Sequence, residues 1–377
     1  MGFLLRPELS LTPPAAHGAL DIGELERAGL SPDSVIDFSA NSNPFGPSPA
    51  VRAAIAQIPL DRYPDREHLA LRRALAERLD VSPKQLVIGN GTAELIWLIA
   101  FAFLKPRSSS HVETEKAALI LGPTFGEYER AIRLMAATPR HWNAPPVTGF
   151  TVNPAEITRN LDSANASTVL GKHYQLVFLC NPNNPTGQVI PPAAILAWAK
   201  AHPRTLFVVD EAYLAFVPGL ESVVPFQRRN LLALRSMTKD YALAGLRLGY
   251  AVGDERLIHI LQAIQPAWNV NALAQAAGLA ALSDEPYYQA TLTQLHDEKT
   301  FLLNGLRKLG FCPVPSQTHF FLLPVENAAQ FRQSLLRQGI LVRDCTSFGL
   351  PTYVRLSPRT HQENRQLLNC LQTGSDR

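Results

Sequence analysis

A lysine in a short polar loop is the residue of this sequence whose surroundings best suit covalent chemistry. Residues 231–234 and 248–252 are apolar runs that predict buried strands, and the loop between them contains Ser236, Lys239 and Arg247. The Ser236 hydroxyl and the planar Arg247 guanidinium can bind one anion together. A lysine amine beside an anion site is what a phosphorylated aldehyde requires, whereas an isolated lysine is usually a solvated surface charge.

Two further polar side chains follow predicted strands. Residues 174–180 and 205–209 are unbroken apolar runs, and Asn184 and Asp210 come shortly after them. Such runs, separated by helical patterns, predict an α/β fold with a mostly parallel sheet between two layers of helices. Because ligands of these sheets bind at the carboxyl ends of the strands, we expect Asn184, Asp210 and Lys239 to meet at one edge.

The side chains at this edge suit pyridoxal phosphate. Asp210 could keep the ring nitrogen of this cofactor protonated, which makes the ring a better electron acceptor. Asn184 and Tyr213 can donate hydrogen bonds to the ring oxygen, and Phe125 offers an apolar face for stacking. Taken singly, Asn184 could belong to a turn, Asp210 could cap a helix, and the two aromatic residues could fill the core. Their joint occurrence in this order favours the cofactor site.

The cofactor phosphate has a predicted site of its own. A strand at residues 86–88 is followed by a glycine turn and an apolar helix. Free backbone amides at the start of a helix bind anions, so the amides of Thr92 and Ala93 are candidates beside Ser236 and Arg247.

Composition limits the classes of function. The chain has 377 residues, 46% of them hydrophobic and 18% charged, and a formal net charge of +3. This balance argues against a nucleic-acid surface, and the longest apolar run, residues 95–104, is too short to span a bilayer. The first residues lack the pattern of a signal peptide. We therefore expect a cytoplasmic protein with reduced thiols and no metal site, since the cysteines lack metal-ligand spacing. They are Cys180, Cys312, Cys345 and Cys370.

The order of the patterns predicts three parts. Residues 1–44 form an irregular N-terminal arm that packs with a small domain, residues 45–265 form a large cofactor-binding domain, and residues 266–377 form the small α+β domain. In the large domain a helix begins at Ser48-Pro49, and a later one carries Leu71, Leu75 and Leu79 on one face. Further helices are predicted at 193–201, 255–264, 272–282, 286–309, 328–338 and from about 361. Further strands are predicted at 117–121, 320–323, 340–343 and 353–356.

Three motifs resemble the fold-type I pyridoxal-phosphate aminotransferase superfamily. They are Asn-Pro-Asn-Asn-Pro-Thr-Gly (181–187), Asp-Glu-Ala-Tyr (210–213) and Ser-Met-Thr-Lys with Gly-Leu-Arg-Leu-Gly-Tyr (236–250). The resemblance runs from about residue 17 to 371. It implies that Lys239, Asp210 and Tyr213 act in catalysis and contact the cofactor together with Asn184, Ser236, Arg247, Phe125, Thr92, Ala93 and Tyr63. Tyr63 matches a tyrosine that reaches the cofactor of the other subunit, which implies a homodimer with shared sites.

Within the superfamily the chain resembles the branch of histidinol-phosphate aminotransferases and threonine-phosphate decarboxylases. Asp-Phe-Ser-Ala-Asn-Ser-Asn-Pro-Phe-Gly (37–46), which contains Asn43, and the preceding His17-Gly18 are most similar to the decarboxylases of cobalamin biosynthesis. The resemblance implies a small phosphorylated amino acid as substrate, bound by Arg355, Arg343, His17, Gly18 and Asn43. Ala19 stands where a second glycine is often found.

The sequence leaves the reaction open. The bond of the substrate α-carbon that stands perpendicular to the cofactor ring is the one that breaks, and the sequence does not show this orientation. We expect decarboxylation of L-threonine O-3-phosphate to (R)-1-amino-2-propanol O-2-phosphate, with a histidinol-phosphate or aromatic aminotransferase as the alternative. A ligand-sensing module without activity is a third reading, but the full set of cofactor-contacting residue types favours an enzyme.

Overall fold

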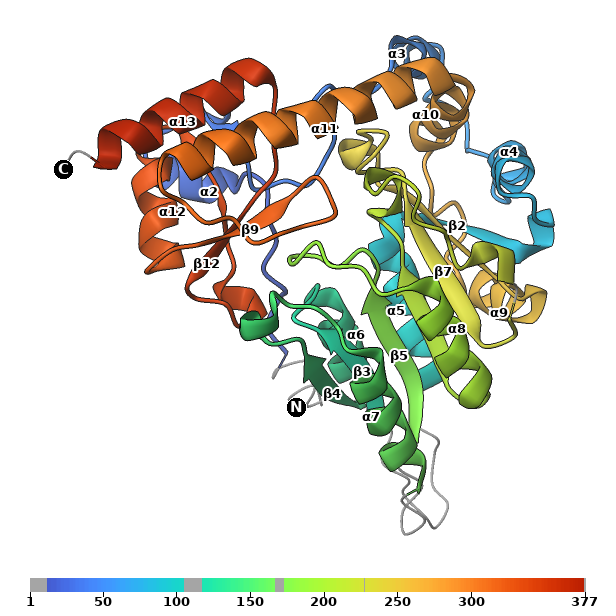
Figure 1. Cartoon of the computed structure of the whole chain (residues 1–377). Coiled ribbons are helices and arrows are strands. Elements are labelled where there is room, and N and C mark those ends of the chain that lie inside the picture. Colours follow the sequence, from blue (N-terminus) through green and yellow to red (C-terminus); the bar gives the residue numbers. More distant parts are fainter. Residues whose placement is uncertain (1–11, 105–116, 167–172, 227, 376–377) are drawn as a thin grey trace, which may run out of the picture.

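The structure is a computed structural model and describes residues 12–104, 117–166, 173–226 and 228–375. Its larger lobe is built on a seven-stranded sheet with the order β2-β8-β7-β6-β5-β3-β4 (Figure 1). β8 runs antiparallel to both of its neighbours, and the other neighbouring pairs are parallel. The strands are β2 (Leu86–Asn90), β3 (Ala117–Gly122), β4 (Thr138–Asn143), β5 (Tyr174–Cys180), β6 (Leu206–Asp210), β7 (Leu231–Ser236) and β8 (Leu248–Gly253). The predicted α/β class and the mostly parallel sheet are confirmed.

Helices cover both faces of this sheet, because side chains alternate between the faces along each strand. Leu119, Val177 and Phe207 belong to one core, and their neighbours Ile120 and Phe178 belong to the other. The first core includes residues of α3 (Pro49–Ala56), α4 (Leu69–Leu79), α7 (Pro154–Ala166), α8 (Pro192–Ala201) and α10 (Ala272–Ser283). The second includes residues of α5 (Gly91–Leu104), α6 (Glu127–Leu134) and α9 (Glu255–Ile264).

A smaller lobe is formed by the C-terminal part of the chain. A three-stranded antiparallel sheet has the order β11-β12-β9 and lies beside helices α12 and α13 (Figure 1). The long helix α11 (Glu285–Lys308) extends over both lobes. The other elements are β9 (Phe321–Pro324), α12 (Ala328–Leu336), β10 (Ile340–Leu341), β11 (Arg343–Asp344), β12 (Tyr353–Leu356) and α13 (His361–Ser375).

The N-terminal segment joins the smaller lobe. β1 (Ile36–Asp37) pairs in parallel with β10. The expected irregular arm is wrong in part, because it contains the helix α2 (Ile22–Arg27). The Asp21 side chain caps this helix, and Leu25 packs with Leu336 and Leu341 of the smaller lobe. Residues 1–11 of the expected arm lie outside the described residues.

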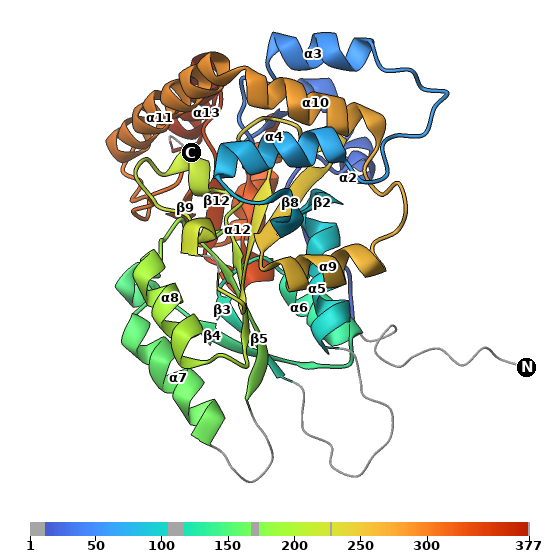
Figure 2. The ribbon, with the colours of Figure 1, turned by 90° about the vertical axis from the view of Figure 1, so that its right-hand side faces the viewer.

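Two elements of the larger lobe lacked a clear sequence pattern. β4 is an edge strand that contains Pro139 and three exposed residues, which an edge position tolerates. α7 buries only Ile157 and Leu161 among its described side chains. The division at residues 265 and 266 stays a prediction, although α10 beyond it packs on α3 and α4 (Figure 2).

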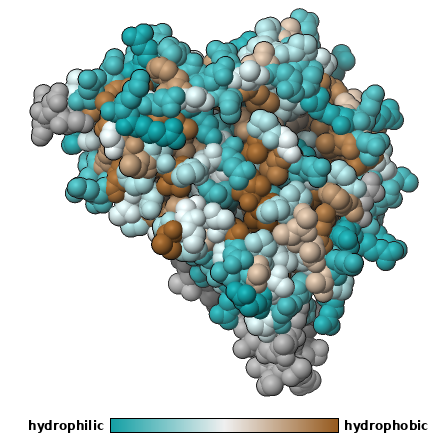
Figure 3. All heavy atoms as spheres, viewed as in Figure 1, coloured by the Kyte–Doolittle hydropathy of each residue, from teal (hydrophilic) through white to brown (hydrophobic). Residues whose placement is uncertain are grey.

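No helix among the described residues is long and apolar enough to cross a membrane. On the face shown in Figure 3, hydrophilic residues predominate and apolar residues gather mainly in the middle, between the two lobes.

Candidate active site

The polar residues that follow β5, β6 and β7 lie at one edge of the sheet. These three strands are adjacent and parallel, with Cys180 opposite Asp210 and Asp210 opposite Leu234. Asn184 follows β5, and Lys239 follows β7. Both the Asp210 carboxylate and the Arg355 guanidinium act electrostatically on the Lys239 amine. The sheet topology therefore brings together the residues that the sequence placed at strand ends.

Asp210 is a buried carboxylate with two neutral partners. Its Oδ2 accepts a hydrogen bond from the Tyr128 hydroxyl at 2.7 Å, and its Oδ1 accepts one from the Ala212 amide at 3.1 Å. Burial raises the pKa of Asp210, and the Tyr128 hydrogen bond opposes this shift. No described ion pair neutralises this carboxylate, so a protonated ring nitrogen would supply the missing positive partner.

Lys239 has the properties of a nucleophilic amine. Burial lowers its pKa to about 8, and the positive charges of Arg355 and Arg247 act in the same direction. Its backbone carbonyl accepts a hydrogen bond from the Asn43 amide at 2.8 Å, which fixes the loop. An amine with this pKa is partly neutral near pH 8, and the neutral form is the one that attacks a carbonyl carbon.

The start of α5 and the lysine loop together form an anion site. The Ser236 hydroxyl lies 2.7 Å from the Thr238 hydroxyl at the end of β7. Gly91 has a φ of +74°, and a Cβ there would lie 2.9 Å from Nη2 of Arg247. A Cβ on Gly249 would lie 2.8 Å from the Thr92 amide nitrogen. Glycine at these positions lets the start of α5 approach both Arg247 and strand β8 closely, as a phosphate site requires.

Tyr213 and Asn184 lie on the side of the smaller lobe. The buried Tyr213 ring packs edge-on against Phe320 at 4.8 Å between centroids, and burial raises the pKa of its hydroxyl. The Asn184 Oδ1 accepts a hydrogen bond from Nη1 of Arg355, so the Asn184 amide nitrogen is the group that can donate to a ring oxygen. Phe125 packs edge-on against Tyr128 at 5.6 Å, next to Asp210.

These residues fit pyridoxal phosphate. A buried carboxylate without a cation suits the ring nitrogen, and a glycine-lined set of amides with Ser236 and Arg247 suits the phosphate. Lys239, whose amine has a lowered pKa, is the residue that would hold the aldehyde carbon. The contacts of individual residues with the cofactor stay predictions.

Two arginines stand side by side on the sheet of the smaller lobe. Arg343 of β11 lies directly opposite Arg355 of β12, and both are buried. Nη2 of Arg343 donates to Ala16 O and Ser347 Oγ, and Nη2 of Arg355 donates to Ser39 O. Among the described residues no carboxylate forms an ion pair with either guanidinium. Two buried positive charges held by neutral acceptors are available for anions of a ligand.

The His17-Gly18 segment lies against this arginine pair. A Cβ on Gly18 would lie 2.6 Å from Ser39 O and 3.4 Å from Nη2 of Arg355, so only glycine permits the approach. Nε2 of His17 lies 3.0 Å from Oε1 of the buried Glu127. Ala19, where a glycine was expected, has a φ of +94°, which is the backbone region that favours glycine. Alanine at position 19 therefore keeps the backbone conformation that glycine favours.

Two predicted site residues have other surroundings. The Asn43 side chain donates to Asp240 O at 3.1 Å and to Thr291 Oγ1 at 2.9 Å, which are the contacts of a residue that positions the lysine loop. Tyr63 is 81% exposed and packs its ring on Trp268 at 4.7 Å between centroids. An exposed aromatic pair agrees with contact to a second subunit, and the shared-site homodimer stays a prediction.

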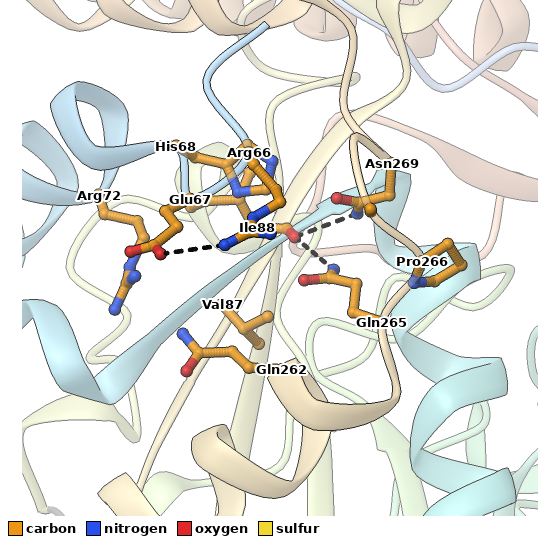
Figure 4. Close-up of a pocket in the computed structure, with 11 residues that line it drawn as sticks. Arg66, Glu67, His68, Arg72, Val87, Ile88, Gln262, Gln265, Pro266 and Asn269 are labelled. Carbon is orange, nitrogen blue, oxygen red and sulfur yellow. Dashed lines mark hydrogen bonds and ion pairs between the residues drawn. The ribbon is translucent and has the colours of Figure 1, made fainter.

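A separate polar cavity of about 390 Å³ lies at the β2 edge of the sheet (Figure 4). Gln265 and Asn269 donate to the Ile88 carbonyl at 2.7 and 3.5 Å. Arg66 forms an ion pair with Glu67 at 3.8 Å. Because none of the predicted catalytic residues lines the cavity, we assign the chemistry to the Lys239 site.

Sequence reasoning missed several partners of the predicted residues. Tyr128 donates to Asp210, Ser39 accepts from Arg355, and Glu127 contacts His17. Glu127 also accepts a hydrogen bond from Trp97 Nε1 at 3.1 Å. Each partner is distant in sequence from the residue it contacts, so local patterns carried no signal for the pairing.

Comparison with known proteins agrees with this geometry. The family model of aminotransferase class I and II matches residues 33–371. A histidinol-phosphate aminotransferase from Moorella thermoacetica is 34% identical over 363 residues, with 93% of this chain and 88% of the relative covered. A threonine-phosphate decarboxylase from Salmonella typhimurium is 34% identical over 376 residues, with 95% and 96% covered. The crystal structure of L-threonine-O-3-phosphate decarboxylase from Porphyromonas gingivalis is 27% identical, with a TM-score of 0.75 and coverage of 90% of this chain and 99% of that one. The chain therefore belongs to the class I and II aminotransferases, a fold-type I family whose cofactor is pyridoxal phosphate.

Proposed function

We propose that this protein decarboxylates L-threonine O-3-phosphate to (R)-1-amino-2-propanol O-2-phosphate, as a pyridoxal-phosphate enzyme of the threonine-phosphate decarboxylase type. The observation that carries the proposal is the pair of buried guanidiniums, Arg343 and Arg355, which lack acidic partners among the described residues and lie against the His17-Gly18 segment. The 34% identity to a named decarboxylase over nearly the whole chain supports it.

The arginine pair favours a substrate with two anionic groups. Threonine phosphate carries a carboxylate and a phosphate, whereas histidinol phosphate carries a phosphate and no carboxylate. A planar guanidinium binds either anion through paired hydrogen bonds. We assign the substrate carboxylate to Arg355, which also contacts Asn184 of the cofactor site, and the phosphate to Arg343 and the His17-Gly18 segment.

The roles of the chain's own residues follow from their surroundings. The bound cofactor supplies an electron acceptor for the bond that breaks at the α-carbon. Asp210 would hold the positive charge on the ring nitrogen, and Tyr128 keeps this carboxylate oriented. Tyr213 and Asn184 would hold the ring oxygen. Lys239 would deliver a proton to the α-carbon after carbon dioxide has left, because an amine with a pKa of about 8 can both hold and release a proton near neutral pH.

A histidinol-phosphate aminotransferase that uses 2-oxoglutarate is the second candidate. Several similar relatives, among them the protein from Moorella thermoacetica, bear that name. Its cosubstrates also carry two anionic groups, which the arginine pair could bind in the second half of the reaction. In this case Lys239 would remove the α-proton and return it to the cofactor.

Direct assay of both reactions separates the candidates. The purified, cofactor-loaded protein is incubated with L-threonine O-3-phosphate, and released carbon dioxide is measured. A parallel reaction contains histidinol phosphate and 2-oxoglutarate, and glutamate is measured. Carbon dioxide release supports the proposal, whereas glutamate formation without it assigns the aminotransferase reaction.

Two variants connect the activity with the site. Lys239→Ala is expected to abolish both turnover and the covalent label that borohydride leaves on the cofactor-loaded protein. Lys84→Ala, at an exposed lysine in the turn before β2, is the matched control and should retain both. A borohydride label on a lysine other than Lys239 would contradict the assignment of the site.

A further inference from the structure

A second cavity lies outside the candidate active site, on the far side of Tyr213. It has a volume of about 430 Å³, is open to solvent on one side, and is lined by α11, by the segment after β6 and by the segment before β9. Most of its wall is apolar, and the polar groups that line it are basic or neutral. The residues on which the argument depends are Phe216, Pro218, Leu292, Leu295, Lys299 and His319.

Lys299 is a buried cation of this cavity without an acidic partner. The side chain is 9% exposed, and its ammonium donates to one protein acceptor, Ser316 O, at 2.7 Å. No carboxylate of the described residues forms an ion pair with it. Burial alone lowers the pKa of Lys299 to about 8. An ammonium group donates three hydrogen bonds, so this one has capacity left for a ligand.

His319 adds a second unsatisfied group. It is 3% exposed, and neither ring nitrogen forms a hydrogen bond of good geometry within the described structure, although the Asn41 backbone lies close enough to act on the ring. Its ring packs on Phe216 at 3.8 Å between centroids. The charge of Lys299 acts on it and, together with burial, lowers its pKa well below the ordinary value. A neutral imidazole can donate one hydrogen bond and accept another, and an unpaired buried polar group is rare without a ligand or water.

We propose that this cavity binds a small organic carboxylate with an apolar body. The carboxylate would be held by the Lys299 ammonium and the His319 imidazole, and the body would lie against Phe216, Leu292 and Leu295. One cation and one imidazole on a mostly apolar wall suit a monoanion better than a phosphate, which requires more donors.

The cavity contacts the active site through aromatic rings. The His319 and Tyr213 rings lie 6.2 Å apart, and Phe320 contacts Tyr213 at 4.8 Å. Phe320 also lies under the Arg355 guanidinium at 5.6 Å. A ligand that displaces the His319 ring would therefore press on two residues of the proposed catalytic machinery, and occupancy should alter turnover.

Calorimetric titration of the cofactor-loaded protein with sodium benzoate at pH 7 tests the proposal. Benzoate has the predicted chemistry, and benzamide is a control of the same size without the charge. We expect benzoate to bind with a dissociation constant below about 10 mM, and benzamide and inorganic phosphate to bind at least about tenfold more weakly. No benzoate binding in this range would overturn the proposal.

Variants locate the bound benzoate. Lys299→Met keeps the length of the side chain and should weaken binding at least about tenfold, whereas Lys308→Met, on the exposed end of the same helix, should leave it unchanged. Ala215→Phe, which fills the cavity from the other wall, should also weaken it. Loss of binding in Arg355→Met but not in Lys299→Met would place benzoate in the active site and refute the proposal. Because binding is read without turnover, failure here is separable from failure of the proposed function.

Discussion

Asp240, the residue after the candidate nucleophile, should make the stability of the protein depend on pH. Its carboxyl group is buried, with Oδ2 accepting from the Tyr288 hydroxyl at 3.0 Å and Oδ1 accepting from the Tyr241 amide at 3.0 Å. Arg235 and Arg78 act on this cluster electrostatically, but neither forms an ion pair with Asp240 among the described contacts. Burial raises the pKa of Asp240 from 3.8 to about 6.

The sign and size of the effect follow from this shift. Below pH 3.8 the carboxyl is protonated in both the folded and the unfolded chain, and its folded environment costs nothing extra. As the pH rises from 3.8 through 6, the unfolded chain ionises this carboxyl first and the folded protein only later. The free energy of unfolding therefore falls over this range. The difference of about 2.2 units, from 3.8 to about 6, corresponds to about 3 kcal/mol above pH 6.

Asp240→Asn removes this ionisation while keeping the shape of the side chain. At pH 7 we expect the apo-protein variant to be more stable than the wild type by about 2–3 kcal/mol, or about 4 °C in melting temperature for a chain of this length. At pH 4.5 the gain should be mostly lost. Asp61→Asn, at an exposed position, is the control and should leave the melting temperature unchanged at both pH values.

Thermal unfolding followed by circular dichroism from pH 4.5 to 8 gives the result. If Asp240→Asn and the wild type show parallel melting curves across this range, Asp240 is not the titrating group and the reasoning is refuted. The outcome also concerns function, because the Asp240 backbone carbonyl is held by Asn43 beside the Lys239 loop.

Three further results are expected. Arg355→Met should lower kcat/KM for the substrate about 100- to 1000-fold, since two charge-assisted hydrogen bonds to a carboxylate are lost, and the cofactor absorbance should be retained. Tyr128→Phe should raise the pKa of Asp210 and lower kcat about tenfold, seen as an altered pH profile of the cofactor absorbance. Mixing inactive Tyr63→Ala and Lys239→Ala subunits should restore about a quarter of the active sites if the dimer shares them, and no recovery would exclude sharing.

The sequence predicted most of the larger lobe because its strands are buried on both faces. The continuous apolar runs at residues 174–180 and 231–234 correspond to β5 and β7, and the polar residues after them are found at one sheet edge. The proline at helix position one and the Ser48 cap marked the start of α3 correctly. A strand that is buried on both faces must be apolar at nearly every position, so it can be recognised from the sequence alone.

The rest depended on contacts between distant residues. β4 is a partly exposed edge strand, so its sequence Thr-Pro-Arg-His-Trp-Asn carries little apolar signal. The pairing of Arg343 with Arg355 results from the register of β11 and β12, which are separated by a turn and a short 3₁₀ helix. The contact of Asp210 with Tyr128 joins residues 82 positions apart. Such pairings are fixed by tertiary packing, which no local pattern encodes.

The presence or absence of an acidic partner distinguishes the structural from the functional cations of this protein. Arg235 is partly buried and forms an ion pair with Glu211 at 2.8 Å, so its charge is satisfied within the chain. Arg343, Arg355 and Lys299 are more deeply buried, but among the described residues they have only neutral acceptors. An uncompensated buried cation destabilises a fold, and three of them near one junction between lobes would be a large cost if they served packing alone. Anionic ligands remove that cost, which is why the same criterion points both to the proposed substrate site and to the second cavity.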